Sequence, residues 1–331
     1  MTSPSRPSIP SSRSPNSELA PGEGRSGPAN TGLPSVSVVV PVLNGEATLG
    51  ECLAALGAVD YPPERREVIV VDNGSTDATA AIVKRRPVTY LWEPRRGPAI
   101  ARNAGIGAAA GDVVAFTDAD CLPTTGWLRE MIRPLGDQDV GGVAGEILPF
   151  PPKTAAERYA ARIRHLSPRR YLNRPIFPFA VTANLAFRRE VFDRAGRFDP
   201  EAPRGGESTD FCTRFFRACG QRLELAPRAV VFHRHRTTSR DLFAQQWGYG
   251  RGHAYLYLKY RDELPWGAAE TARVYRDLAA TIAGLGSTAV RSSLGSSSRG
   301  ELEFRYFDSL RKLALRLGFA REALARGRLM L

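Results

Sequence analysis

Cysteine is scarce in this sequence, and the few cysteines present do not form a recognisable metal or redox motif. Only four occur among 331 residues, and no two form a CxxC pair: Cys52, Cys121, Cys212 and Cys219. Neither a zinc site nor a redox-active pair is therefore indicated. Reduced thiols in a cytoplasmic protein are the simplest interpretation.

Long hydrophobic runs are also missing. No stretch reaches the roughly 18 uncharged apolar residues that a membrane span needs. Residues 281–290 come nearest, but glycine and serine weaken that segment. No apolar segment follows the first residues, so we expect no signal peptide. Residues 1–34 hold eight serines and seven prolines, and because they cannot form a core we predict a disordered tail there.

Lysine is rare, and the basic charge is unevenly distributed. Only four of the 46 basic residues are lysine, and the net charge is +12. Residues 1–34 contribute +1, residues 35–227 contribute +2 and residues 228–331 contribute +9. No helix-turn-helix, zinc-finger or RNP-like motif accompanies this charge, so we expect no nucleic-acid partner. The basicity belongs to the C-terminal part of the chain.

Three strongly apolar runs, at residues 36–40, 67–71 and 112–116, each end in polar loop residues. β-branched residues dominate the first two runs, which is typical of buried strands. The segments between them are helical in character, for example residues 78–85, which Thr76 or Asp77 can cap. Strands that alternate with helices predict an α/β fold with a parallel sheet.

Acidic residues follow two of these strands. Asp72 ends the second run, and Asp118 and Asp120 follow the third within the segment Thr117-Asp118-Ala119-Asp120-Cys121. Open α/β sheets bind ligands at the carboxyl ends of their strands. Carboxylates gathered there suit a divalent cation that carries substrate phosphates. The alternative is that these are solvated aspartates in turns.

Several further segments occur in a fixed order around the acidic pair: Val39-Val40-Pro41-Val42-Leu43-Asn44-Gly45, Val70-Val71-Asp72-Asn73-Gly74-Ser75-Thr76-Asp77, Gly97-Pro98-Ala99-Ile100-Ala101-Arg102-Asn103-Ala104-Gly105, the Asp118–Asp120 segment above, Ala183-Asn184-Leu185-Ala186-Phe187-Arg188-Arg189 and Gly205-Gly206-Glu207-Ser208-Thr209-Asp210-Phe211. Together, over about residues 35–255, they resemble glycosyltransferase family 2, which has the GT-A nucleotide-diphospho-sugar transferase fold. The last two segments resemble the acceptor-side segments of that family.

The resemblance implies a mostly parallel Rossmann-like sheet flanked by helices, with a helical C-terminal extension. We therefore expect a glycosyltransferase domain over residues 35–240 and a basic helical extension over residues 241–331. The implied reaction is metal-dependent, inverting transfer of a sugar from a nucleotide-diphospho-sugar to an acceptor hydroxyl. The segment at residues 245–252 only loosely resembles the Gln/Arg-Trp segment of processive members, so a single transfer is favoured.

The resemblance also implies roles for individual residues. Asp120 would hold the metal and diphosphate, and Asp118 would contact the ribose or the metal. Asp72 would accept a hydrogen bond from the base, and Arg102 would reach the base or ribose side. His233 matches the position of a metal-site histidine, and the cation would be magnesium or manganese. The remaining donor-site candidates are Pro41, Asn44 and Arg251.

The proton-accepting base is harder to assign, because this chain departs from the family pattern. Family members commonly carry Glu-Asp-x-Asp-Leu where this chain has Glu207-Ser208-Thr209-Asp210-Phe211. Ser208 cannot serve as a base at neutral pH, so a neighbouring carboxylate must do so. Glu207 is our first candidate and Asp210 the second. The alternative for Asp210 is a helix N-cap ahead of residues 211–218.

Two basic amphipathic segments leave the cellular location open. Residues 153–174 place Tyr159, Ile163 and Leu166 on one helical face among arginines, and a second stripe lies in the C-terminal extension. That stripe consists of Phe304, Phe307, Leu310, Leu313, Ala314 and Leu317. Either it binds an anionic membrane surface at the inner face of the cell membrane, where a lipid-linked or envelope acceptor would lie, or it packs against the catalytic domain or a second subunit.

Two other functions remain open at this point. A nucleotidyltransferase also uses acidic pairs on an α/β sheet, but it usually opens with a Gly-rich loop and a basic residue, which Val40-Pro41-Val42-Leu43-Asn44 lacks. A sugar-nucleotide-binding protein without catalysis is compatible with serine at position 208. Release of nucleoside diphosphate, of pyrophosphate, or of neither product distinguishes the three functions.

Overall fold

The computed structural model describes residues 32–174, 177–264 and 267–327. The described residues from Pro34 onward form one compact unit. The predicted disordered tail therefore lies outside the described residues, apart from residues 32–34.

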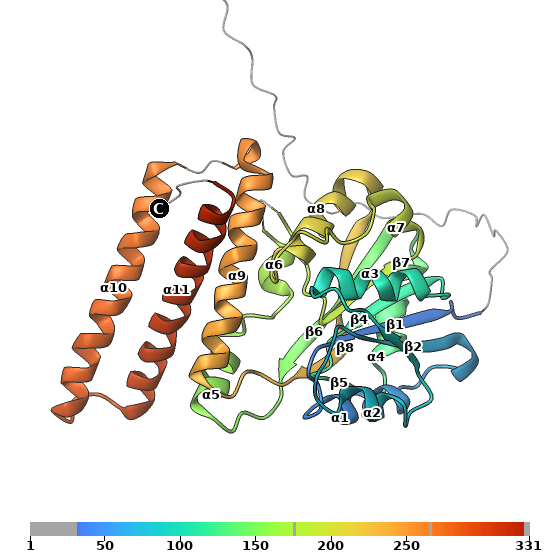
Figure 1. Cartoon of the computed structure of the whole chain (residues 1–331), viewed down its shortest axis with the longest axis horizontal. Helices are drawn as coiled ribbons and strands as arrows, with labels where there is room; N and C mark the ends of the chain where they lie inside the picture. Colours follow the sequence, from blue (N-terminus) through green and yellow to red (C-terminus); the bar gives the residue numbers. More distant parts are fainter. Residues whose placement is uncertain (1–31, 175–176, 265–266, 328–331) are drawn as a thin grey trace, which may run out of the picture. The chain divides into compact units, whose positions relative to one another are not determined.

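An eight-stranded sheet forms the centre of the unit, in the order β3-β2-β1-β4-β7-β6-β8-β5 (Figure 1). The strands are β1 (Val36–Val42), β2 (Arg66–Asp72), β3 (Thr89–Trp92), β4 (Val113–Thr117), β5 (Cys121–Pro123), β6 (Val140–Pro149), β7 (Asn184–Arg188) and β8 (Arg222–His233). The three predicted strands correspond to β1, β2 and β4. Most of their residues are buried, as in strands covered on both faces, although the first three residues of β2 are only half-buried.

The sheet combines two kinds of pairing. β1 pairs in parallel with β2 and β4, β2 with β3, and β6 with β8. β7 is antiparallel to β4 and β6, and β5 is antiparallel to β8. The predicted α/β fold is confirmed, and the sheet is mixed. The parallel half brings the carboxyl ends of β1, β2 and β4 to one edge.

Helices cover both faces of the sheet. Those in the first two-thirds of the chain are α1 (Leu49–Gly57), α2 (Thr79–Val83), α3 (Pro98–Ala108), α4 (Trp127–Ile132), α5 (Ala155–Ile163), α6 (Arg169–Leu172), α7 (Glu190–Ala195) and α8 (Glu207–Cys219). α3, α7 and α8 enclose the main core together with sheet residues such as Val39 and Phe116. α1 and α4 pack on β5, β6 and β8 (Figure 1).

The predicted helical extension consists of three long helices: α9 (Ser239–Lys259), α10 (Ala268–Ser293) and α11 (Arg299–Ala325). α11 lies between α9 and α10 and packs on both (Figure 1). No helix within the described ranges combines the length and apolar character that a bilayer span requires.

The two amphipathic stripes seen in the sequence pack partly against each other. Tyr159 of α5 is buried beside Phe307, and the two rings stack with centroids 5.7 Å apart. The Tyr159 hydroxyl donates a hydrogen bond to Asp308 at 2.9 Å, and the Arg162 guanidinium lies 4.2 Å from the Phe304 ring centroid. This part of the α11 stripe therefore packs within the chain, as the second of the two alternatives expected.

Candidate functional site

Asp120 and His233 are brought together by the antiparallel pairing of β5 with β8. Cys121 lies opposite His233 in this ladder, and the Arg234 amide donates to the Asp120 carbonyl at 2.9 Å. As a result His233 Nε2 is 3.4 Å from Asp120 Oδ1. Arg236 Nη2 is 3.4 Å from the other oxygen, Oδ2. Residues 113 positions apart in the sequence thus share one sheet edge.

This pair has the donor atoms that a divalent cation needs. Asp120 Oδ1 and His233 Nδ1 are buried, and neither has a hydrogen-bond partner among the described residues. Asp120, Cys121 and His233 each offer a ligand atom within 4.8 Å of the others. Burial, followed by the charges of Asp120 and Asp118, raises the pKa of the Cys121 thiol, which disfavours the thiolate form that binds metals. Carboxylate and imidazole together suit manganese better than magnesium, which prefers oxygen ligands.

Arg102 links the acidic segment after β4 to the first turn of α8. Its Nη2 donates to Asp118 Oδ1 at 3.2 Å, and its Nη1 donates to Glu207 Oε1 at 3.1 Å. Arg102 and Glu207 are both nearly fully buried, whereas about a third of the Asp118 side chain is exposed. Arg102 therefore bridges two carboxylates, and its predicted contact with the base or ribose stays a prediction. No local pattern in the chain indicates a pairing between residues 105 positions apart.

Glu207 and Asp210 lie in quite different surroundings. Glu207 Oε2 accepts a hydrogen bond from the Gly205 amide at 2.6 Å, within the loop that precedes α8. Asp210 is completely buried, with Tyr260 and Lys259 on Oδ1 and Arg214 on Oδ2. Asp210 lies inside the first turn of α8, whose N-cap is Gly206, so the N-cap alternative was wrong. The structure brings Glu207 to the acidic edge and holds Asp210 in a network between helices.

The candidate nucleotide loop follows β2. Asp72 is buried, and its carboxylate accepts hydrogen bonds from the Ser75 amide at 2.8 Å and the Tyr90 hydroxyl at 3.0 Å. Asn44 accepts from the Thr76 amide at 2.9 Å and has φ of +52°, a conformation that asparagine tolerates. Pro41 lies in β1 beyond the last residue paired with β4, where its missing amide costs no hydrogen bond. These three residues share one side of the sheet edge.

Helix α9 contributes a residue that the sequence interpretation missed. Tyr249 lies on Gly205, where an added Cβ would be 2.6 Å from its ring, and the charges of both Asp118 and Glu207 act on its hydroxyl. The Arg204 side chain, from the loop before α8, packs against Gly248 of α9. By contrast, Arg251 pairs with Glu322 of α11 at 2.7 Å, and no contact joins it to the acidic edge in the described chain. In the sequence, the glycines between positions 248 and 252 could have indicated that other segments pack closely on this part of the chain.

Three glycines allow α9 to pack this closely. A Cβ on Gly250 would lie 2.1 Å from the Leu315 carbonyl oxygen of α11, and one on Gly318 would lie 2.1 Å from the Trp247 carbonyl oxygen. A Cβ on Gly252 would lie 2.5 Å from the Gly206 amide nitrogen. α9 is therefore in backbone contact with α11 on one side and with the loop before Glu207 on the other.

Asn184, in the segment that resembled an acceptor-side motif, braces the strands behind the site. Its side-chain amide donates to the carbonyls of Glu146 and Ala229 at 2.9 and 2.8 Å, and its oxygen accepts from the Trp127 indole at 2.7 Å. These bonds tie β7 to the irregular part of the β6–β8 ladder, where the register shifts between Gly145 and Glu146. Asn184 thus supports the strand that ends at His233.

Comparison with known proteins agrees with this geometry. The family described as Glycosyl transferase family 2 matches residues 37–196. Glycosyltransferase AglE of Haloferax volcanii is 30% identical over 240 residues, which cover 70% of this chain and 77% of that protein. The pre-mycofactocin glycosyltransferase of Mycobacterium tuberculosis is 32% identical over 72% of this chain, and the match spans only half of its own length.

A solved structure shares the fold. Mannosyltransferase PcManGT from Pyrobaculum calidifontis, in complex with GDP-Man and Mn²⁺, aligns with a TM-score of 0.62 and 23% sequence identity. The alignment covers 91% of this chain and 90% of that chain, so it includes most of the described helices as well as the sheet.

Proposed function

Since this chain belongs to glycosyltransferase family 2 and has the GT-A fold, we propose that it transfers a single sugar from a nucleotide-diphospho-sugar to an acceptor hydroxyl. The transfer would be metal-dependent and inverting. The observation that carries this proposal is the Arg102 bridge. The Arg102 guanidinium binds both Glu207 and Asp118, at the edge where Asp120 and His233 meet. A proton acceptor and a diphosphate site adjoin there.

Each site residue has a role in this proposed transfer. Pro41, Asn44 and Asp72 hold the nucleoside. Asp118, Asp120 and His233 would hold the cation, which would supply positive charge to the diphosphate leaving group. Arg236, which reaches Asp120, adds positive charge on the same side.

Glu207 acts as general base. It accepts the proton of the acceptor hydroxyl while that oxygen bonds to the anomeric carbon and the bond to the diphosphate breaks. The nucleoside diphosphate leaves, and direct displacement inverts the anomeric configuration. Both Glu207 oxygens already accept one hydrogen bond, but each carboxylate oxygen has a second lone pair for the acceptor hydroxyl. Asp210 remains the second candidate for this role.

The acceptor in this proposal is a hydroxyl of a cell-envelope or lipid-linked glycan, reached at the inner face of the cell membrane. This part is supported by the charge of +9 over residues 228–331 and by the exposed apolar side chains of α10, which are considered below. Tyr249 and Arg204, beside Glu207, are the side chains that would line the acceptor approach.

Nucleoside diphosphate release tests the proposal. The full chain, with Mn²⁺, is incubated with UDP-, GDP- and dTDP-sugars in turn, and the product is measured. Asp120→Ala should lower metal-dependent turnover by about 10³, because several kcal/mol of charge stabilisation are lost, while the fold is retained. Asp60→Ala, at an exposed ion pair with Arg129, is the matched control and should behave as wild type. Wild-type donor affinity of Asp120→Ala with Mn²⁺ present would contradict the assignment, as would pyrophosphate as the product.

A further inference from the structure

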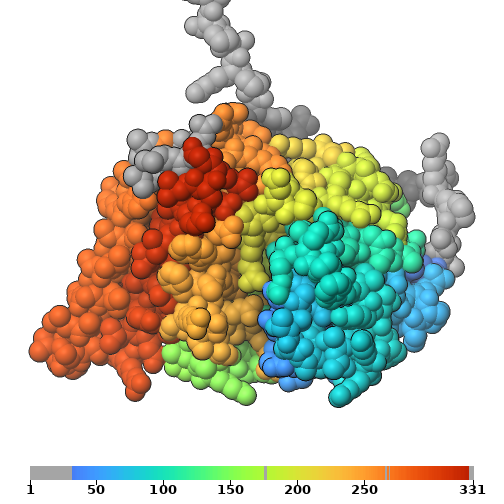
Figure 2. Space-filling model, in the orientation of Figure 1, coloured from blue at the N-terminus to red at the C-terminus, as the bar shows by residue number. Residues whose placement is uncertain are grey.

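The hairpin formed by α10 and α11 carries most of the large hydrophobic side chains that the described chain exposes. Trp92 and Leu43 lie elsewhere. The other eight are all within the hairpin: Tyr275, Ile282, Val290, Leu294, Tyr306, Leu313, Leu317 and Leu324. Figure 2 shows α10 with its outer side uncovered by other described elements.

Helix α10 carries apolar side chains both toward α11, where Leu285 is half-buried, and on the opposite, exposed side. Its contacts with α11 include polar ones: Lys312 lies 3.0 Å from Asp277 and donates to the Thr281 hydroxyl at 2.7 Å. Ile282 and Val290, in contrast, are 48% and 60% exposed. An amphipathic helix of a water-soluble protein normally turns its apolar stripe inward and its polar face to solvent. The outer face of α10 is therefore suited to an apolar environment.

The distribution of charge on α10 limits what that environment can be. Residues 278–290 contain no charged side chain, while Arg273 and Arg276 come just before them. Arg305 of α11 lies against α10, 3.6 Å from the position of a Cβ on Gly284. Within the residues that the structure describes, these three arginines form no ion pair. Within the described chain, this uncharged segment is thus bordered by arginines that have no acidic partner.

We propose that the outer face of α10 binds the surface of an anionic lipid membrane. Ile282 and Val290 would enter the interface, and Arg273 and Arg276 would stay at the level of the lipid phosphates. Membrane binding was one of the two alternatives for the apolar stripe of α11, but Phe307 of that stripe is buried against α5. The outward-facing helix takes that role.

A second copy of the chain fits this face less well. In a two-fold dimer the same patch meets itself, so the arginines would approach one another. The acidic residues of α10 already have partners within the chain. Asp277 forms an ion pair with Lys312, and Glu270 accepts a hydrogen bond from the Gly267 amide at the start of α10. Anionic head groups supply the missing negative charge.

Vesicle co-sedimentation of the full chain tests the inference without relying on the transfer reaction. Wild-type protein should sediment with vesicles of phosphatidylcholine mixed with phosphatidylglycerol, less with phosphatidylcholine alone, and less at high salt. Ile282→Glu combined with Val290→Glu should weaken binding at least about tenfold, because two apolar contacts are lost. Arg273→Gln combined with Arg276→Gln should weaken it roughly 30-fold at low salt.

Trp92→Glu is the matched control, since it makes the same kind of change at a side chain that is 63% exposed on the edge strand β3. It should sediment as wild type does. Absence of sedimentation with the mixed vesicles, or equal sedimentation of the wild-type protein and both double variants, would overturn the inference. Light scattering that shows a wild-type dimer, converted to monomer by Ile282→Glu and Val290→Glu without vesicle binding, would assign the face to a second copy instead.

Discussion

On the donor side of the candidate site, the polar residues are held by the strands that carry them and by the loops next to those strands. Asp72 is fixed by Ser75 three positions away, and Asp120 by the ladder between β5 and β8. On the acceptor side, Glu207 depends on helices that come from distant parts of the chain. Gly252 of α9 packs on its loop, and α11 packs on α9. Substitutions on the donor side should therefore change chemistry with little effect on stability, whereas those on the acceptor side should change stability as well.

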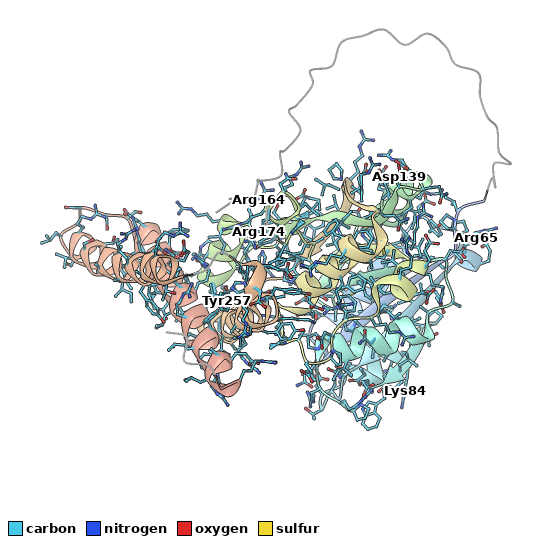
Figure 3. All side chains as sticks on the ribbon, turned by 90° about the horizontal axis from the view of Figure 1, so that it is seen from above. Arg65, Lys84, Asp139, Arg164, Arg174 and Tyr257 are labelled. Atoms are coloured by element: carbon cyan, nitrogen blue, oxygen red, sulfur yellow. The ribbon has the colours of Figure 1, made fainter. Side chains whose placement is uncertain are left out.

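The helices behind the acceptor side are joined by buried charge. Lys259 of α9 lies 2.7 Å from both Asp199 and Asp210, and the Tyr260 hydroxyl donates to Asp210 at 2.8 Å. Figure 3 shows Tyr257, from the same turns of α9, between the sheet domain and the α10–α11 hairpin. This network connects α8 to α9 in the way that strand pairing connects the residues of the donor side.

The largest effect expected on the acceptor side concerns the base. Glu207→Gln keeps a hydrogen-bond acceptor for Arg102 but removes the proton acceptor, so turnover should fall by about 10² or more with little change in donor affinity. Donor affinity by calorimetry and steady-state turnover measure the two quantities separately.

Two neighbouring substitutions serve as controls for that experiment. Ser208→Ala should leave turnover within about twofold, because no proton passes through this hydroxyl. Asp210→Asn should lower the free energy of unfolding by about 3 kcal/mol, because it weakens a buried ion pair, and it should affect turnover per folded molecule less than Glu207→Gln does. A larger loss of turnover from Asp210→Asn than from Glu207→Gln would exchange their roles.

The second effect concerns the glycines of α9. Gly250→Ala forces a Cβ to within 2.1 Å of the Leu315 carbonyl oxygen, so α9 and α11 must separate, at a cost of about 3 kcal/mol of stability. Gly248→Ala is the control: its nearest neighbour is the Arg204 side chain at 3.5 Å, and alanine there should stabilise the helix by up to about 1 kcal/mol. Chemical unfolding of both variants measures the difference. Equal stabilities would show that the backbone contact between the two helices is not needed.

The donor side was largely predictable from the sequence, because its signals are local. An apolar run that ends in Asp118-Ala119-Asp120 specifies both a strand and the acids at its end, and the same holds for Asp72. His233 could be placed on this edge because it too ends an apolar run. The assignment of each residue to the donor or the metal remains a prediction.

The acceptor side could not be predicted to the same extent, because its contacts join positions far apart. No local pattern indicates that Arg102 pairs with Glu207, or that Asp210 faces Lys259 and Tyr260. The orientation of α10 was also inaccessible. The sequence shows which residues are apolar, but which face of a helix is left uncovered depends on how α11 packs between α9 and α10.

The smallest expected effect concerns Asp199 and depends on pH. Burial alone would raise the pKa of this carboxyl, but hydrogen bonds from Lys259 and Tyr255 lower it to about 2. Its ordinary value is about 3.9, so the unfolded chain binds the proton first as the pH falls. The ionised carboxylate therefore contributes stability above about pH 4, and this contribution is lost as the pH falls towards 2.

Asp199→Asn should accordingly lower the free energy of unfolding by about 2 kcal/mol at pH 7, and the difference from wild type should shrink as the pH falls below about 4. Urea unfolding at pH 7 and near pH 3 measures both values. Asp193→Asn, at an exposed aspartate of α7, should show no such trend. Turnover per folded molecule at pH 7 should stay within a few-fold of wild type, because Asp199 braces α9 without touching Glu207. A difference in stability that is the same at both pH values would show that packing, and not the ionised carboxylate, holds this side of the site together.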